Sequence, residues 1–469
     1  MLFTAPIFLF FFLPLFLAIY FSLPGARNLG ILIGSLFFYA WAEPRFIFWA
    51  LGSSVLDWLL GRSIARASSE KAKRAWLTAG VVANLALLFF FKYANFFYGT
   101  LLPAFVQAGV KPPPLVHIAL PIAVSFIIFE KITYLVDVYR GVSKPAANIF
   151  AYLVYVFFFP KLLAGPIIRY HEVEPQFRHR VTSWEGLRSG LARFVLGLGK
   201  KVLIADYVGQ ISNQTFQLDP GQLDCRTAWM GVLCFSIQIY FDFSGYSDMA
   251  IGLSRMLGFR LSENFCNPYV AENFTDFWRR WHISLSTWIR DYLYIPLGGN
   301  QRSPARTYLN LCLCFLLSGL WHGAAWNFII WGAFHGLMLI ADRLFWKGLQ
   351  RQLPRLLNVA ITFFLVMMSW VIFRCSSFAQ VEGYFGALFD PGRTAPNLIW
   401  VSPDIALMLG IGLLISFAPL LPRFPALRAS YDALRWKSLA ELIGCFPLFL
   451  AALAKVSVSS FQAFIYFRF

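Results

Sequence analysis

Long apolar runs separated by short polar connectors dominate the hydropathy pattern of this chain. A helix that crosses a bilayer needs about 20 mainly apolar residues. By that rule the pattern predicts membrane helices at Leu2–Leu23, Asn28–Ala42, Phe46–Leu60, Trp76–Phe91, Val116–Val138, Ile149–Ile168, Leu191–Ile204, Ala228–Leu257, Tyr308–Leu320, Ala324–Ile340, Leu356–Phe373, Ile405–Leu421 and Leu439–Val456. Some of these runs are short, and we expect tilted, re-entrant or interfacial helices there. The prediction is an all-α, polytopic integral membrane protein with about ten to thirteen membrane helices.

The polar stretches are too short to form a separate soluble domain. The longest, Arg169–Ser189 and Gly209–Thr227, are connectors. We therefore predict that residues 1–469 form a single transmembrane domain.

Composition and charge support a membrane protein and argue against several other classes. Of 469 residues, 58% are hydrophobic and 13% charged, whereas soluble domains average about 45–50% apolar and about 25% charged residues. The net charge of +17 resides in short loops, which is typical of cytoplasmic loops and not of a nucleic-acid-binding domain. By this rule three loops are predicted to be cytoplasmic: Gly61–Ala75, Asp342–Arg355 and Pro422–Lys437. The seven cysteines form no CxxC pair, and no metal site is expected.

Ionisable residues inside apolar runs are costly, so each one is a functional candidate. Glu130 and Lys131 occupy one such run, where local pairing and chemistry are both open interpretations. Asp242 and Asp248 lie six residues apart, on nearly opposite faces of a continuous helix. That spacing does not support a carboxylate pair for acid–base chemistry. A structural or cavity-lining role is favoured for both.

The segment Asn267–Asn300 predicts an amphipathic helix. Asn273 with Asp276 three residues later resembles a helix start. Trp278 and His282 then fall on one stripe, and such an aromatic-rich helix is typical of a membrane surface. His282 has two equally open interpretations: it forms a hydrogen bond at the membrane interface, or it belongs to a functional site.

His322 follows a long apolar run and stands between Trp321 and Gly323. A neutral histidine can take a proton from a hydroxyl near neutral pH. The alternative for a lone membrane histidine is a helix–helix hydrogen bond. His335 lies thirteen residues on, off the helical face of His322, so the two do not predict a metal pair. Phosphate-loop, dinucleotide, nucleophile-elbow and zinc-protease motifs are absent from the sequence.

At these two segments the sequence resembles a known family. "DFWRRWHISLSTWIRDYLYIPLGGN" and "SGLWHGAAWNFIIWGAFHG" resemble the membrane-bound O-acyltransferase superfamily, in its bacterial alginate O-acetyltransferase branch. Stretches such as "FFPKLLAGPIIRY" and "IQIYFDFSGYSDMAIGLSRMLGF" extend the resemblance over nearly the whole chain. One departure is Ala123, where relatives often carry glycine.

The resemblance implies a membrane O-acetyltransferase of the bacterial inner membrane. An acetyl group from cytoplasmic acetyl-CoA would pass through a central channel for O-acetylation of an exopolysaccharide such as alginate. A periplasmic partner of SGNH-hydrolase type would complete the esterification. The catalytic histidine of the family corresponds to His322 and the other signature histidine to His282, with Asn267 at the head of the same region.

Acyl transfer to a hydroxyl requires a base and a donor that stabilises the oxyanion. We expect His322 to be the base, and His282, Trp321 or Trp326 to be the donor. Lys200 and Lys201 are candidate ligands for the phosphates of CoA, although positive-inside charge alone also explains them.

The sequence leaves three alternative functions open. The first is D-alanyl or lipid O-acyl transfer within the same superfamily. The second is a channel or transporter that uses Asp242, Asp248 and Glu130 as an ion path. The third is a purely structural partner subunit. The enzymatic interpretation requires His322 to be reachable through a gap between the helices.

Overall fold

Helices form every regular element in the described part of the chain, as the apolar pattern predicts. The computed structural model describes residues 1–112, 118–394, 399–432 and 437–458. The first two residues of the predicted span Val116–Val138 lie outside the described residues. The chain divides into two compact units, and the prediction of a single transmembrane domain stays a prediction.

Unit 1 comprises Met1–Arg188 and Leu253–Ser262. Its helices, together with π- and 3₁₀-helical turns labelled η, are η1 (Phe8–Phe12), α1 (Leu13–Ser22), η2 (Pro24–Ala26), α2 (Arg27–Ala42), α3 (Phe46–Arg66), α4 (Glu70–Leu88), η3 (Phe89–Tyr93), α5 (Ala94–Gln107), α6 (Val124–Tyr139), α7 (Ile149–Phe157), α8 (Phe159–Leu162) and α9 (Tyr170–Arg178).

Unit 2 comprises Ser189–Gly252 and Glu263–Phe469, and α10 and α12 extend from it into unit 1. Its elements are α10 (Trp184–Gly199), η4 (Lys200–Ala205), α11 (Asp206–Gln217), η5 (Pro220–Gln222), α12 (Cys225–Met256), η6 (Pro268–Val270), α13 (Phe274–Arg280), α14 (Ile283–Ile289), η7 (Arg290–Tyr294), α15 (Pro304–His322), α16 (Trp326–Ala341), η8 (Asp342–Trp346), α17 (Lys347–Gln350), α18 (Arg355–Arg374), α19 (Phe378–Phe389), α20 (Pro403–Phe417), η9 (Ala418–Leu420), α21 (Phe424–Asp432) and α22 (Lys437–Val458).

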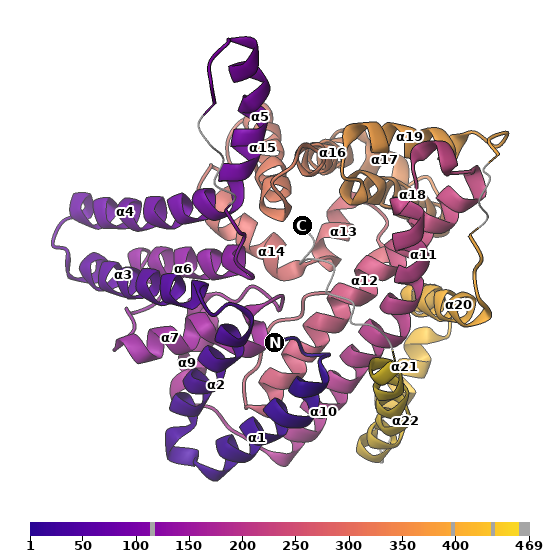
Figure 1. The fold of residues 1–469 in the computed structure, drawn as a ribbon. Helices are drawn as coiled ribbons and strands as arrows, with labels where there is room; N and C mark the ends of the chain where they lie inside the picture. The colour runs from indigo at the N-terminus through magenta and orange to yellow at the C-terminus, as the bar shows by residue number, and fades with distance from the viewer. Residues whose placement is uncertain (113–117, 395–398, 433–436, 459–469) are drawn as a thin grey trace. The chain divides into compact units, whose positions relative to one another are not determined.

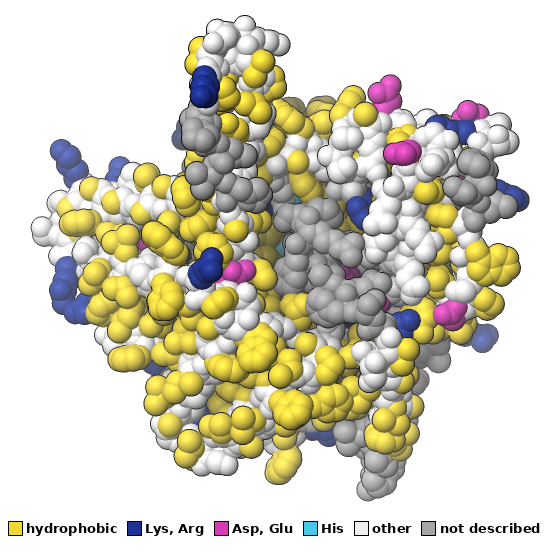
Figure 2. All heavy atoms as spheres, viewed as in Figure 1, with side chains coloured by type: hydrophobic (Ala, Val, Ile, Leu, Met, Phe, Trp, Pro, Cys, Tyr) yellow, Lys and Arg dark blue, Asp and Glu magenta, His cyan; other side chains and the backbone are white. Residues whose placement is uncertain are grey.

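The helices are apolar enough for an integral membrane protein, but the expected number of spans is not confirmed. By length and composition, four helical stretches among the described residues could cross a membrane: Glu70–Gln107, Trp326–Gln350, Arg355–Arg374 and Pro403–Leu420. A pair bent by 108°, Phe8–Ser22 with Pro24–Ala42, makes a fifth if it counts as one span. Two predicted spans are shorter as helices than as apolar runs: α6, in Val116–Val138, has 16 residues, and α7, in Ile149–Ile168, has 9. Figure 2 shows hydrophobic side chains over much of the visible surface, consistent with a chain that faces lipid.

Ion pairs between helices hold the buried charges of unit 1. Helices α3, α4 and α6 lie side by side (Figure 1). The Lys131 ammonium of α6 lies 2.9 Å from the Asp57 carboxylate of α3, and Glu130 pairs with Lys161 of α8. Local pairing of Glu130 with Lys131 is therefore wrong, because consecutive helical residues face different neighbours.

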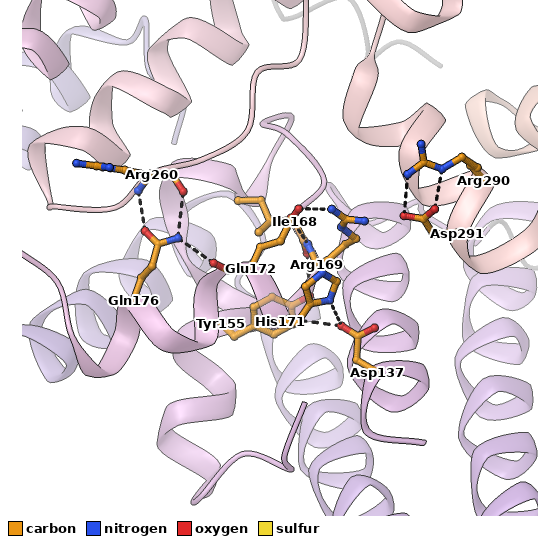
Figure 3. A network of polar contacts seen from close by, with 10 residues as sticks. All are labelled: Asp137, Tyr155, Ile168, Arg169, His171, Glu172, Gln176, Arg260, Arg290 and Asp291. Atoms are coloured by element: carbon orange, nitrogen blue, oxygen red, sulfur yellow. Dashed lines mark hydrogen bonds and ion pairs between the residues drawn. The ribbon is translucent and has the colours of Figure 1, made fainter. Parts of the chain in front are cut away.

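A second polar cluster in unit 1 surrounds the start of α9 (Figure 3). His171 Nδ1 lies 2.8 Å from a carboxylate oxygen of Asp137, at the end of α6. Tyr155 donates a hydrogen bond to the carbonyl of Ile168 at 2.9 Å. Asp137 and Glu130 thus each contact a basic side chain, which favours a structural role for them over an ion path.

The departure at Ala123 lies at a strained backbone position. Ala123 precedes α6 with φ of 65°, in the left-handed region. A side chain there is unfavourable, and glycine adopts this conformation at no steric cost. The conformation gives a physical reason to expect glycine at this position.

Candidate functional site

The helical hairpin of α15 and α16 in unit 2 places His322. Helix α15 begins after Ser303, whose hydroxyl accepts a hydrogen bond from the Arg306 amide, and it ends with His322. The two helices approach closely at glycines. A Cβ on Gly319 would lie 2.2 Å from the Phe328 carbonyl oxygen, and one on Gly332 would lie 2.3 Å from that of Phe315. Only glycine permits this contact, because backbone atoms cannot move aside as a side chain can.

Aromatic rings surround the buried imidazole of His322, which is 5% exposed. Its ring centroid lies 5.0 Å from that of Trp321, 5.1 Å from Trp331 of α16 and 5.6 Å from Phe373 of α18. Such a wall excludes water and lowers the local dielectric constant, which strengthens any hydrogen bond to a reacting group.

His282 interrupts the predicted amphipathic helix. The helix start at Asn273 is confirmed, since its side chain accepts a hydrogen bond from the Asp276 amide at 2.8 Å. The continuous helix is wrong: α13 ends at Arg280, α14 begins at Ile283, and His282 between them has φ of 44°. The Ile283 amide donates instead to the carbonyl of Asn264 at 2.9 Å, so tertiary hydrogen bonding replaces a helical one.

Asn264 determines which ring nitrogen of His282 carries the hydrogen. The side-chain oxygen of Asn264 accepts from the Ser284 amide at 3.3 Å, which assigns the orientation of its own amide group. His282 Nδ1 lies 3.1 Å from that oxygen, so Nδ1 carries the ring hydrogen and donates a hydrogen bond to Asn264. The Asn264 amide nitrogen donates in turn to Ser247 at 3.0 Å.

The remaining nitrogen of His282, Nε2, is therefore a hydrogen-bond acceptor. It is buried and contacts no hydrogen-bond donor among the described residues. Burial lowers the pKa of His282 to about 3, because the charged form is poorly solvated there. Such a ring stays neutral at cellular pH and cannot donate from Nε2. The structure therefore argues against His282 as the oxyanion donor.

His335 forms a hydrogen-bonded chain beside this site. The Trp278 indole donates to His335 Nδ1 at 3.2 Å, and His335 Nε2 lies 3.2 Å from the Ser369 hydroxyl. Ser369 donates to the carbonyl of Val366 at 2.6 Å. The chain joins α13, α16 and α18, and Trp331 lies against both His335 and His322, with ring centroids 4.6 and 5.1 Å away.

A cavity of about 980 Å³ lies along α15 within unit 2. The residues of α15 that line it recur at helical spacing and share one face: Pro304, Thr307, Tyr308, Leu311, Cys314, Phe315 and Ser318. From Pro304 to Ser318 this face is about 21 Å long at 1.5 Å per residue. Ser318 lies one turn before His322 on the same face, so the described lining ends one helical turn from the candidate base.

The cavity is strongly basic at one end. Its lining contains five cationic side chains and, among the described lining residues, no Asp or Glu: Arg279, Arg290, Arg302, Arg343 and Lys347. Arg290 pairs with Asp291 (Figure 3). The other four form no ion pair with a described residue and are exposed. The α15 lining at the other end, Cys314 to Ser318, carries no charge.

The predicted phosphate ligands Lys200 and Lys201 already have ionic partners. The Lys200 ammonium lies 2.6 Å from the Asp248 carboxylate. That of Lys201 lies 2.9 Å from Asp242 and 2.5 Å from Asp206. Helix α12 is unbroken here, and Gly245 gives it a close contact with Gly197 of α10. The arrangement favours a structural role for these five charged groups over phosphate binding or an ion path.

The other predicted site residues are divided between the buried site and the surface. Trp321 contacts both imidazoles, with centroids 6.1 Å from His282 and 5.0 Å from His322. Trp326 is 58% exposed at the start of α16. Asn267 takes a left-handed conformation, φ 46°, and begins the turn at Pro268.

Sequence reasoning missed Asn264 and the basic lining of the cavity. Asn264 lies 18 residues before His282, and no spacing rule connects an irregular segment with a helix break. The sequence showed these cations as positive charge in the loops. It could not show that they converge on one cavity, because that depends on how η7, α15 and η8 pack.

Comparison with known proteins gives a consistent result. Residues 117–378 match the sequence profile of MBOAT, the membrane-bound O-acyltransferase family. The chain is 41% identical over 503 aligned positions to a probable alginate O-acetylase AlgI of Azotobacter vinelandii, with 100% of both chains covered. It is 45% identical to that of Pseudomonas aeruginosa, covering 84% of this chain and 75% of the relative. A peptidoglycan O-acetyltransferase of Helicobacter pylori is 38% identical, with 80% and 77% covered.

Proposed function

The chain belongs to the membrane-bound O-acyltransferase family, and from that premise we propose that it transfers acetyl groups from acetyl-CoA toward an exopolysaccharide, with alginate the first candidate. The observation that carries the donor assignment is the cavity along α15. Exposed Arg302, Arg343 and Lys347 lie near the start of α15 and the end of α16, and Ser318, the last lining residue of α15, lies one turn from His322.

The cavity suits a donor with an anionic head and a long neutral arm. Arginine and lysine bind phosphates through charge-assisted hydrogen bonds. The uncharged α15 face leads away from them for about 21 Å and points an extended thioester toward His322. Arg343 and Lys347 belong to the loop predicted to be cytoplasmic, so a cytoplasmic donor would enter at the charged end.

In the proposed reaction His322 is the general base. It takes the proton of the acceptor hydroxyl as the oxygen attacks the thioester carbonyl. The C–S bond then breaks, and the thiolate leaves with the proton that His322 returns. His282 accepts a hydrogen bond at Nε2 from a second, non-reacting hydroxyl of the acceptor and so orients it, because the only N–H of His282 is used by Asn264.

The acceptor side of this proposal includes a second protein. In this proposal the acetyl group crosses the bacterial inner membrane through a central channel, and a periplasmic partner of SGNH-hydrolase type completes transfer to the polymer. The names of the relatives support a glycan acceptor. Analysis of which polymer carries acetyl esters would identify the acceptor.

Transfer of radiolabelled acetyl groups from acetyl-CoA by the purified protein in proteoliposomes tests the proposal. We expect His322→Gln to lower the rate by at least ~10³-fold, because the base is removed, with unchanged folding by thermal melting. His179→Gln, an exposed histidine near the end of α9, is the matched control and should retain the parental rate. Near-normal transfer by a folded His322→Gln variant would refute the base assignment.

The same assay separates the acyl donors. Dependence on a D-alanyl carrier protein, with no turnover of acetyl-CoA, would favour D-alanyl transfer. Ion flux without any acyl donor would favour a transporter. Mass spectrometry of the acetylated polymer distinguishes alginate from peptidoglycan as the acceptor.

A further inference from the structure

Two buried hydrogen-bond donors beside His322 lack acceptors among the described residues. They are the indole nitrogen of Trp331 and the hydroxyl of Ser318. Trp331 is 1% exposed and Ser318 2% exposed. A buried donor without an acceptor is destabilising, and native proteins seldom retain one without a reason.

The Ser318 hydroxyl departs from the usual behaviour of serine within a helix. Such hydroxyls commonly donate to the carbonyl four residues earlier. Ser236 of α12 does so to Val232 at 2.7 Å, and Thr215 of α11 does so to Ile211 at 2.5 Å. Ser318 lacks that bond, so its donor is available to a ligand at the end of the cavity that it lines.

Both donors lie next to the candidate base. Trp331 contacts the His322 ring, with centroids 5.1 Å apart and planes at 86°. Ser318 lies one turn before His322 on the same face of α15. The close contact of Gly319 with Gly332 brings the two helix segments together, since each glycine directly adjoins one of the donors in sequence.

We propose that the Trp331 N–H and the Ser318 O–H form the oxyanion hole of the acyl transfer. This inference rests on the proposed function. As the acceptor oxygen attacks, the electron pair of the carbonyl π bond moves onto the carbonyl oxygen. The two donors then hydrogen-bond that oxygen until the C–S bond breaks and the carbonyl re-forms. Neither donor loses its proton, so His322 alone carries the proton from the hydroxyl to the thiolate.

Two of the three donors suggested by the sequence, His282 and Trp326, fit less well. The N–H of His282 is used by Asn264, and Trp326 is largely exposed. Trp331 combines burial, contact with His322 and an indole N–H that no described acceptor uses.

Trp331→Phe and Ser318→Ala test the inference against two controls, an indole whose N–H has a partner and an unpartnered hydroxyl on another helix. Trp229→Phe removes an indole whose N–H does have a partner, the carbonyl of Leu388 at 3.0 Å. Ser416→Ala removes a buried hydroxyl on α20 that also lacks a described partner. The assay is acetyl transfer from acetyl-CoA, with kcat, KM and thermal melting measured for each variant.

We expect Trp331→Phe to lower kcat by about 10²-fold, at the low end of the range for loss of one oxyanion donor, and Ser318→Ala, which removes the weaker donor, by about 10-fold. KM for acetyl-CoA should change less than about threefold, because the donors act only in the transition state. Ser318→Ala should keep or raise the melting temperature, since an unpaired buried donor is removed, whereas Trp331→Phe also leaves a cavity where the larger ring packed and should lower it modestly. Trp229→Phe should lower the melting temperature and retain kcat, and Ser416→Ala should retain kcat.

Two results would overturn the inference alone: parental kcat in both variants while His322→Gln is inactive, or a fall in kcat that merely follows a lower melting temperature. A parent protein that transfers no acetyl group would refute the proposed function and this inference together.

Discussion

Asn264 gives His282 its chemical character. Its side-chain oxygen accepts a hydrogen bond from the Nδ1–H, which leaves Nε2 as the ring nitrogen without a hydrogen-bond partner among the described residues. Because the same oxygen also accepts from Ser284, the orientation of the amide is determined twice. One uncharged side chain therefore determines which role a neighbouring imidazole can take in acyl transfer.

Asn264→Asp is predicted to make the reaction sensitive to acid. A carboxylate beside Nδ1 favours the imidazolium, so it raises the pKa of His282 from about 3. As the pH falls through that raised pKa, Nε2 binds a proton and ceases to accept hydrogen bonds. We expect the ratio of mutant to parental kcat to fall as the pH is lowered from about 8 to about 5, around the ordinary histidine pKa.

The pH–rate profiles of the parent, Asn264→Asp and Asn264→Ala provide the measurement. Asn264→Ala removes the acceptor without adding charge, so its ratio to the parent should not depend on pH. A constant ratio for Asn264→Asp as well would show that His282 Nε2 takes no part in the reaction.

At the scale of elements, the hairpin of α15 and α16 organises the site. Glycines at 319 and 332 allow backbone contact, and that contact brings Trp331 against His322. Helix packing in membranes depends on such small residues, because lipid offers no hydrophobic force that drives helices together. The separation of the two helices is thus a direct determinant of catalytic geometry.

Gly319→Ala is predicted to disturb both stability and rate. Its Cβ would lie 2.2 Å from a backbone oxygen, and overpacking of this kind costs about 1–3 kcal/mol. We expect a lower melting temperature in detergent and a lower kcat, because Trp331 moves away from His322. Gly410→Ala on α20, where a Cβ meets nothing within 4 Å, is the control. Equal melting temperatures for the two variants would contradict the packing argument.

At the scale of the whole molecule, the 40 Lys and Arg side chains have two different uses. Some are neutralised inside the units, as in the pairs of Lys131 with Asp57 and Lys200 with Asp248. Others form no ion pair with a described residue and are exposed at the cavity, as are Arg302 and Arg343. Only the second kind can attract an anionic ligand.

Neutralising the cavity cations is predicted to weaken donor binding selectively. We expect Arg302→Gln, Arg343→Gln and Lys347→Gln combined to raise KM for acetyl-CoA by at least ~10-fold, through lost charge-assisted hydrogen bonds, with kcat preserved. The salt dependence of KM should also become smaller, since exposed charges are screened. The control removes three exposed cations elsewhere, Lys71, Lys111 and Arg423. Equal effects in the two triple variants would show that net charge alone is responsible.

The sequence by itself determined the class of protein and the identity of the family. Apolar runs must bury their backbone polar groups in helices within lipid, so the helical class followed from hydropathy alone. The helix start at Asn273 also followed from local chemistry, because a cap needs only its own first turn. Long motifs around His282 and His322 indicated acyl transfer before any geometry was known.

Only the tertiary structure decided how those residues meet. The break at His282, the hydrogen bond from Asn264 and the partners of Glu130 and Lys131 all depend on residues far apart in the chain. Periodicity reports which face a residue occupies, but it does not report which helix lies opposite that face. For the same reason the basic cavity and the two donors beside His322 emerged only when α13, α15 and α16 were packed together.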